Sequence, residues 1–143
     1  MVVMTREAPK KSLTISNEHQ LEMLDNALPI IKKLLVVLLD NDVSSIMGFF
    51  RHDVYRYFFL LTFMVEYFEG SEISQEHAIS LVPQKFASRI KRLQVLKQAV
   101  ELGYIIEESS TVDKRRRIYS PSAELVLEFL DGANNINDIF NKS

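Results

Sequence analysis

The sequence contains no cysteine and only four glycines among its 143 residues. Without cysteine there is no disulfide framework and no thiol chemistry, which fits a reducing compartment, and we expect a cytoplasmic protein. No glycine stands in a G-x-G cluster, so there is no glycine-rich phosphate loop. The apolar run Leu34 to Leu39 is too short to span a bilayer, and Met1 to Lys11 lacks the apolar run of a secretory signal. We therefore expect no membrane partner and no export signal.

Residue patterns for catalysis or metal binding are also missing. The histidines His19, His52 and His77 are scattered, and none stands at metal-ligand spacing from another ligand. There is no G-x-S-x-G elbow. The neighbouring carboxylates Glu107 and Glu108 would point to opposite faces of a strand and could not converge on one substrate. The sequence thus predicts no enzyme, no metal site and no cofactor.

Length and composition fit one folded domain that follows a flexible segment. The hydrophobic share of 47% suits a packed core, and 143 residues are within the range of one domain. Residues 1–15 show no helical period, so we expect a flexible arm, with a frayed terminus favoured over an arm that reaches DNA. The remaining residues, 16–143, are predicted to form a single domain.

Apolar residues at spacings of three and four predict a long helix that begins near Asn17. Pro29 lies inside it and should kink or break it, because proline removes a helical donor. Beyond Pro29, the run Leu34 to Leu39 is apolar on all sides, so a helix there needs cover on several faces. A second subunit is the natural cover, and we expect a homodimer.

Nine of the fourteen aromatic residues fall between Phe49 and Phe68. Such density is typical of a hydrophobic core. A pocket for a small aromatic effector is the alternative. Its candidate lining residues are Tyr55, Phe59, Phe63 and Tyr67.

Two helices separated by a short turn are predicted next. Ser74 is the expected N-cap of the first helix, and Pro83 should end it, because the residue before proline avoids helical angles. The second helix is predicted over 84–102, where apolar residues recur at helical spacing, and Gly103 should close it in a left-handed conformation. A basic second helix after a short turn is the helix-turn-helix pattern.

A β-hairpin is predicted over 104–119, with four adjacent cations, Lys114 to Arg117, near its tip. Consecutive arginines repel one another within a monomer, whereas a polyanion such as DNA would bind them, and arginine favours a narrow minor groove. Ser120 and Pro121 are then expected to open a C-terminal helix, which Gly132 should stop.

Positive charge is concentrated in this part of the chain although the net charge is −2. Residues 84–117 contain nine basic and four acidic residues, a balance of +5, so the rest of the chain carries −7. A basic lobe on an acidic body can dock one face on phosphates.

The candidate DNA contacts lie on the second helix and on the hairpin. On the helix they share a face opposite the apolar stripe, and the alternative to a groove contact is a solvated face. The helix candidates are Gln84, Lys85, Ser88, Arg89 and Arg92. The hairpin candidates are Lys114, Arg115 and Arg116, and Asp113 is expected to orient a wing cation.

Residues 74–122 resemble the DNA-binding part of the MarR family of winged-helix regulators. The matching residues are Ile73-Ser74-Gln75 at the start of the first helix, Gly103 after the second, and Asp113-Lys114-Arg115, which is similar to the family's Asp-x-Arg wing signature. Tyr119-Ser120-Pro121 stands where the family has an apolar residue, threonine and often proline. The resemblance implies a homodimer on a pseudo-palindromic operator, often released by small phenolic ligands.

The sequence thus predicts a mainly α-helical fold with a small β-hairpin wing, a winged helix-turn-helix flanked by dimerisation helices. Residues 16–70 would hold the dimerisation and core helices, 71–120 the winged helix-turn-helix, and 121–143 the C-terminal helices.

The predicted function is a DNA-binding transcriptional regulator. The helix 84–102 would enter the major groove of double-stranded DNA, and the wing 104–119 would lie on the minor groove. The alternative is a winged-helix protein-interaction or assembly module without sequence-specific DNA binding, whose arginines meet an acidic partner.

Overall fold

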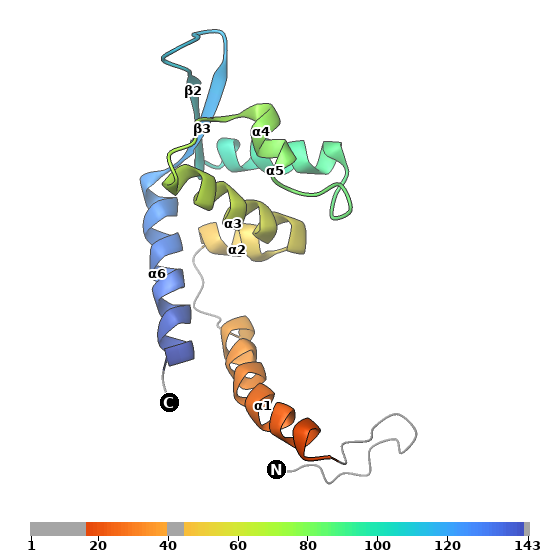
Figure 1. Cartoon of the computed structure of the whole chain (residues 1–143). Helices are drawn as coiled ribbons and strands as arrows, with labels where there is room; N and C mark the ends of the chain where they lie inside the picture. Colours follow the sequence, from red (N-terminus) through yellow and green to blue (C-terminus); the bar gives the residue numbers. More distant parts are fainter. Residues whose placement is uncertain (1–16, 40–44, 142–143) are drawn as a thin grey trace. The chain divides into compact units, whose positions relative to one another are not determined.

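The computed structural model describes residues 17–39 and 45–141 (Figure 1). The arm expected over 1–15 lies outside these residues. The helices are α1 (Glu18–Leu39), α2 (Ser45–Arg51), α3 (Val54–Phe68), α4 (Gln75–Ser80), α5 (Arg89–Glu101) and α6 (Ala123–Asn141). The strands are β1 (Ile73–Ser74), β2 (Ile105–Ser109) and β3 (Arg117–Pro121). The predicted fold class, mainly α-helical with a small β-hairpin, is confirmed.

The chain divides into two compact units, where the sequence had predicted one domain over 16–143. One unit contains α1 and the end of α6 from Ile136 onward, and the other runs from α2 to Asn135. No side chain of α1 is buried, so this helix contributes nothing to a hydrophobic core. Within the first unit, the ammonium group of Lys33 donates a hydrogen bond to the carbonyl oxygen of Phe140 at 2.8 Å.

We expected a kink or a break at Pro29; the helix α1 is continuous through Pro29, so it does not break there. Its N-terminus is capped as predicted, because Asn17 Oδ1 accepts a hydrogen bond from the backbone N–H of Gln20 at 2.8 Å. Proline removes one donor from a helix, and the other turns of this 22-residue helix keep theirs. Most of the large apolar side chains after Pro29 are 47–72% exposed. Those in this range are Ile30, Ile31, Leu34, Leu35, Val36, Leu38 and Leu39.

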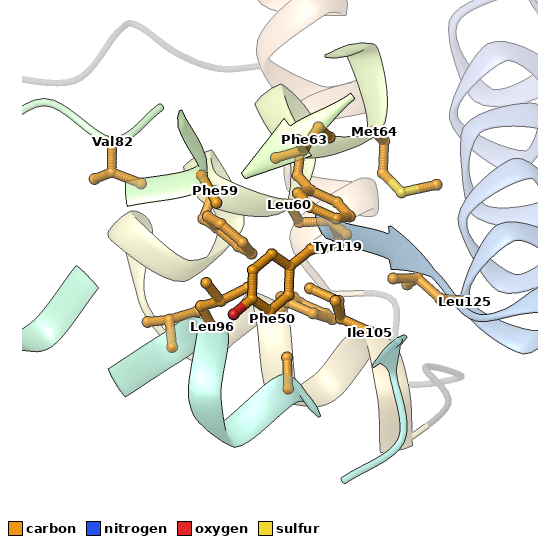
Figure 2. Packing of buried hydrophobic residues seen from close by; sticks show 14 of the residues in the cluster. Phe50, Phe59, Leu60, Phe63, Met64, Val82, Leu96, Ile105, Tyr119 and Leu125 are labelled. Carbon is orange, nitrogen blue, oxygen red and sulfur yellow. The ribbon is translucent and has the colours of Figure 1, made fainter. Parts of the chain in front are cut away.

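The core of the second unit is built around the aromatic residues of α2 and α3 (Figure 2). Phe50, Phe59 and Phe63 are almost fully buried, and the rings of Phe59 and Phe63 stack with their centroids 5.4 Å apart. Other elements add side chains to this cluster, among them Leu96 from α5, Ile105 from β2, Tyr119 from β3 and Leu125 from α6. The core interpretation of the aromatic segment is confirmed.

The four residues of the alternative interpretation, an effector pocket, differ in how they are buried. Phe59 and Phe63, two of its four expected lining residues, are sealed inside the packed core and present no surface to a ligand. Tyr55 is half-buried, and Tyr67 is exposed with its ring centroid 5.6 Å from that of Phe68. Burial separates the four side chains because a helix as apolar as α3 faces the core with one stripe and the surface with another.

The three strands form an antiparallel sheet in the order β1-β3-β2. In the hairpin, Ile105 lies opposite Pro121 and Glu107 opposite Tyr119. The left-handed conformation that we expected of Gly103 after α5 is confirmed, since its φ is +82°. The N–H of the next residue, Tyr104, donates to the carbonyl of Ala99 at 2.9 Å. This left-handed end turns the chain from α5 directly into β2.

The C-terminal helix differs from the prediction at its start and at its end. Pro121 closes β3 instead of opening the helix, and the N-cap is Ser122, whose hydroxyl accepts from the N–H of Leu125 at 3.1 Å. The helix then runs through Gly132 to Asn141 as one element. A glycine inside a helix costs about 1 kcal/mol relative to alanine, which is too little to end a helix of this length.

Candidate nucleic-acid interface

The helices α4 and α5 form the predicted helix-turn-helix and lie beside the β2–β3 hairpin (Figure 1). Each begins with a serine N-cap. The Ser74 hydroxyl accepts from the N–H of His77, and the Ser88 hydroxyl accepts from the N–H of Lys91, both at 3.2 Å. The second helix therefore begins at Arg89 and not at residue 84 as predicted.

The late start of α5 moves two predicted contacts off the helix. Gln84 and Lys85 are exposed but lie in the turn after Pro83, where the N–H of Phe86 donates to the Pro83 carbonyl at 3.0 Å. The hydroxyl of Ser88 caps the helix and is therefore already hydrogen-bonded. The physical reason is the preference of serine for the N-cap position, which gives the helix a better start at Ser88 than the turn residues do.

Arg92 was expected on the exposed face of the helix, and that expectation is wrong. Its side chain is 8% exposed, and its guanidinium Nη1 donates to the carbonyl oxygens of Ile79 at 3.0 Å and Val82 at 3.2 Å. These carbonyls belong to the end of α4 and the turn that follows it, where the regular helical bonding ends, although Ile79 O also accepts a bond from the N–H of Val82 at 3.4 Å. Arg92 therefore joins α5 to the end of α4 and is not presented to a groove.

Arg89 is exposed as predicted, and it is paired with a carboxylate. Its Nη2 lies 2.9 Å from Glu76 Oε2 of α4. The hydrogen bond that Arg89 donates to Glu76, together with the negative charge of that carboxylate, raises the pKa of Arg89, so the guanidinium stays charged at any working pH. Glu76 thus neutralises part of the charge that Arg89 would bring to a phosphate.

Other residues of α5 occupy the surface that the sequence had assigned to Arg92. Ile90 is 68% exposed, and Lys91, Gln94 and Lys97 are exposed as well. Ile90, Gln94 and Lys97 follow one another at spacings of four and three and share one side of the helix. The spacing itself is the sequence signal for this stripe, because residues three and four apart share a helix face wherever the helix begins.

The wing is organised around Ser110, a buried serine in the turn between β2 and β3. Its side chain is 2% exposed. Its hydroxyl donates to Glu72 Oε1 at 3.3 Å and accepts from the N–H of Val112 at 3.1 Å, and its own N–H donates to the carbonyl of Arg116 at 2.8 Å. These bonds close the tip of the hairpin and attach it to the segment before β1.

The cations of the wing differ in how firmly they are held. Asp113 Oδ1 accepts from the backbone N–H of Arg115 at 3.0 Å and lies 3.6 Å from its Nε, which is the pairing expected of Asp113. Arg116 Nη1 lies 3.5 Å from Glu72 Oε1. Arg115 remains 93% exposed, and Lys114 is exposed without an ion pair among the described residues. Lys114 and Arg115 are therefore the cations most accessible to a polyanion.

A polar cluster at the base of the wing connects the hairpin to α5. The hydroxyl of Tyr119 donates to Glu107 Oε2, and the ammonium group of Lys97 lies 3.8 Å from the same oxygen. Burial of the phenol, and secondarily its bond to the Glu107 carboxylate, raises the pKa of Tyr119, so its hydroxyl stays protonated. The wing and α5 are thus held to one another by side chains from both.

Replacing Ser110 with alanine should lower the free energy of unfolding by about 1–2 kcal/mol, because the carboxylate of Glu72 and the backbone N–H of Val112 lose their hydrogen-bond partner at a buried position. Urea unfolding measures the change. Ser109→Ala is the matched control, since Ser109 is exposed and only accepts a bond from Arg117 at 3.4 Å. Equal losses for the two variants would contradict the central place of Ser110 in the wing.

The described residues contain neither a metal site nor a membrane-spanning helix. Residues 17–39 and 45–141 contain no group of three histidines or carboxylates placed to hold a metal ion. None of the helices seen in these ranges is both long enough and apolar enough to cross a membrane.

The chain matches no family model and no curated protein. It does match solved structures. The transcriptional regulator PA4135 is 14% identical over 75% of this chain and 77% of its own, with a TM-score of 0.45. The heme sensor protein PefR from Streptococcus agalactiae, in complex with heme, is 16% identical over 87% and 80%, also at 0.45.

A third match is the adhesin competence repressor AdcR from Streptococcus pyogenes, which is 11% identical over 84% of this chain and 75% of its own, with a TM-score of 0.41. The assignment of the fold rests on the chain's own elements: two helices joined by a turn, α4 and α5, then the hairpin β2–β3, with β1 completing the sheet. This order is the winged helix-turn-helix that the resemblance to the MarR family implies.

Proposed function

We propose that this protein is a DNA-binding transcriptional regulator that acts in the cytoplasm as a homodimer on a pseudo-palindromic duplex site. In the complex α5 enters the major groove and the wing lies on the minor groove. The observation that carries the proposal is the pairing of an exposed, basic α5 face with a cationic hairpin tip in one compact unit. Two such surfaces side by side fit the groove and the backbone of one duplex.

The wing supports this function because its turn has a fixed backbone that presents cationic side chains to the solvent. The side chains of Ser110 and Asp113 accept hydrogen bonds from backbone N–H groups of the turn and fix it, so Lys114 and Arg115 project from a defined backbone. A preformed tip loses little conformational entropy on binding. An exposed arginine held this way suits the negative potential of a narrow minor groove.

The helix α1 supports the dimer. It carries ten large apolar side chains with at least a third of their surface exposed: Leu21, Met23, Leu28, Ile30, Ile31, Leu34, Leu35, Val36, Leu38 and Leu39. Contiguous apolar patches of this kind mark interaction sites. A second copy of the same helix offers a matching apolar surface through a two-fold interface.

The wing contacts are tested by the salt dependence of duplex binding. Arg115→Ala and Lys114→Ala should each weaken binding to all sequences and should each reduce the slope of log K against log salt by about 0.9 for one lost phosphate contact. Lys32→Ala removes the same charge from α1 and should leave the slope unchanged. Fluorescence anisotropy over a salt series gives all three slopes.

Unchanged slopes for both wing variants would contradict the wing contact. Tight association with an acidic protein and none with any duplex at low salt would instead favour a protein-interaction module. The carboxylates of Glu72 and Glu76 already neutralise part of Arg116 and Arg89, so the distinction depends on Lys114 and Arg115.

A further inference from the structure

We propose that Ile90 and Gln94 determine the sequence preference of the protein by recognising A·T base pairs, Ile90 through the methyl group of a thymine and Gln94 through the edge of an adenine. The proposal rests on the proposed function and deepens it. It concerns two residues on the exposed side of α5 whose side chains are accessible to DNA.

Most of the other polar groups at the start of α5 are already engaged. The Ser88 hydroxyl caps the helix, Arg92 is buried against the end of α4, and Arg89 is paired with Glu76 at 2.9 Å. A side chain that reads a base edge has to reach into the groove without a competing partner in the protein. Ile90 and Gln94 meet that requirement among the described residues of this helix.

The position of the two residues matches what a recognition helix presents to DNA. Ile90 is the second residue of α5, and the N-terminal residues of such a helix contact base edges. Gln94 lies four residues later, so its side chain is on the same face as that of Ile90. Lys91 and Lys97 are exposed near them and can bind the flanking phosphates.

The chemistry of the two side chains selects the base pair. Isoleucine has no hydrogen-bonding group, and the apolar feature of the major groove is the thymine C5-methyl group. The glutamine amide has a donor and an acceptor that match N7 and the N6 amino group of adenine. Guanine and cytosine offer Ile90 no methyl group, so the pair together prefers A·T sequences.

The test for Ile90 replaces each thymine of a bound duplex in turn with deoxyuridine, which lacks only the methyl group. The full-length protein should lose affinity about fourfold at one thymine per half-site, the value for one buried methyl-sized group. Ile90→Ala should bind the thymine and deoxyuridine duplexes equally. Leu102→Ala, another exposed aliphatic residue just after α5, should keep the discrimination of the unaltered protein.

The test for Gln94 uses a duplex in which one adenine is replaced by purine, which lacks the 6-amino group. The unaltered protein should lose about tenfold in affinity, and Gln94→Ala should not distinguish the two duplexes. Both tests change the DNA as well as the protein, so they remain decisive if a variant folds poorly.

The outcomes separate this inference from the function on which it rests. A protein that binds duplexes but is indifferent to every deoxyuridine and purine replacement overturns the roles of Ile90 and Gln94 and leaves the regulator function intact. A protein that binds no duplex at low salt overturns both. Discrimination that survives in Ile90→Ala and Gln94→Ala overturns the assignment to these residues.

Discussion

Replacing Arg92 with methionine is expected to lower the free energy of unfolding by about 3 kcal/mol, since two charge-assisted hydrogen bonds are lost and the buried carbonyl of Val82 loses its donor. Methionine fills much of the apolar volume of the arginine stem but cannot donate to Ile79 and Val82. Urea unfolding followed by circular dichroism measures the loss.

Two companion variants make the Arg92 result specific. Arg92→Lys keeps the charge but loses the planar guanidinium fork, so its stability should fall between those of the unaltered protein and Arg92→Met. Lys91→Met makes the same replacement at the neighbouring exposed position and should change stability by less than about 0.5 kcal/mol. If Arg92→Met were as stable as Lys91→Met, the connection between α4 and α5 through Arg92 would be refuted.

A second large effect is expected from Leu35→Glu, which should convert the dimer into a monomer of 16.5 kDa. Leu35 is 52% exposed on α1, within the segment that the dimer proposal covers with a second copy. Burying a leucine contributes about 1.5–3 kcal/mol, and two-fold symmetry applies the loss twice, so the dimer should weaken by about a hundredfold or more.

Sedimentation equilibrium at micromolar concentration measures the molar mass and so distinguishes the dimer from the monomer. Lys32→Gln alters the charge of the same helix by the same amount and should leave the dimer intact. A monomer for the unaltered protein would contradict the dimer itself, and a dimer that survives Leu35→Glu would place the interface elsewhere.

The parts of the fold that the sequence predicts well are those set by local chemistry. Gly103 after an amphipathic segment predicts the end of α5, and Asn17 with Gln20 predicts the start of α1, because left-handed glycine ends and side-chain caps depend on a few neighbouring residues. The hairpin follows from polar turn residues between two short apolar stretches.

The errors arise where tertiary structure decides between local options. Ser120 and Pro121 have the composition of a helix start, but pairing with β2 keeps them in β3, and Ser122 takes the cap. Gly132 is a weak breaker, and α6 continues through it. In both places the local preference is about 1 kcal/mol or less, within reach of a few packing contacts.

Only part of the candidate interface was predicted correctly, again because tertiary contacts decide which side chains are exposed. A cation repeats at helical spacing in residues 84–102 whether it faces solvent or the end of another helix, so the pattern cannot tell exposed Arg89 from buried Arg92. The contact between Ser110 and Glu72 joins residues 38 positions apart and has no signature in either segment. The wing cations lie in a short turn, so their placement depended less on distant contacts.

The most direct test of DNA binding is selection of bound duplexes from a random library by the full-length protein at low salt. We expect enrichment of a palindromic consensus, with half-sites about one helical turn apart as for other dimers that use a recognition helix. Failure to enrich any sequence, with retention no higher than for a neutral protein of the same size, would contradict the proposed function.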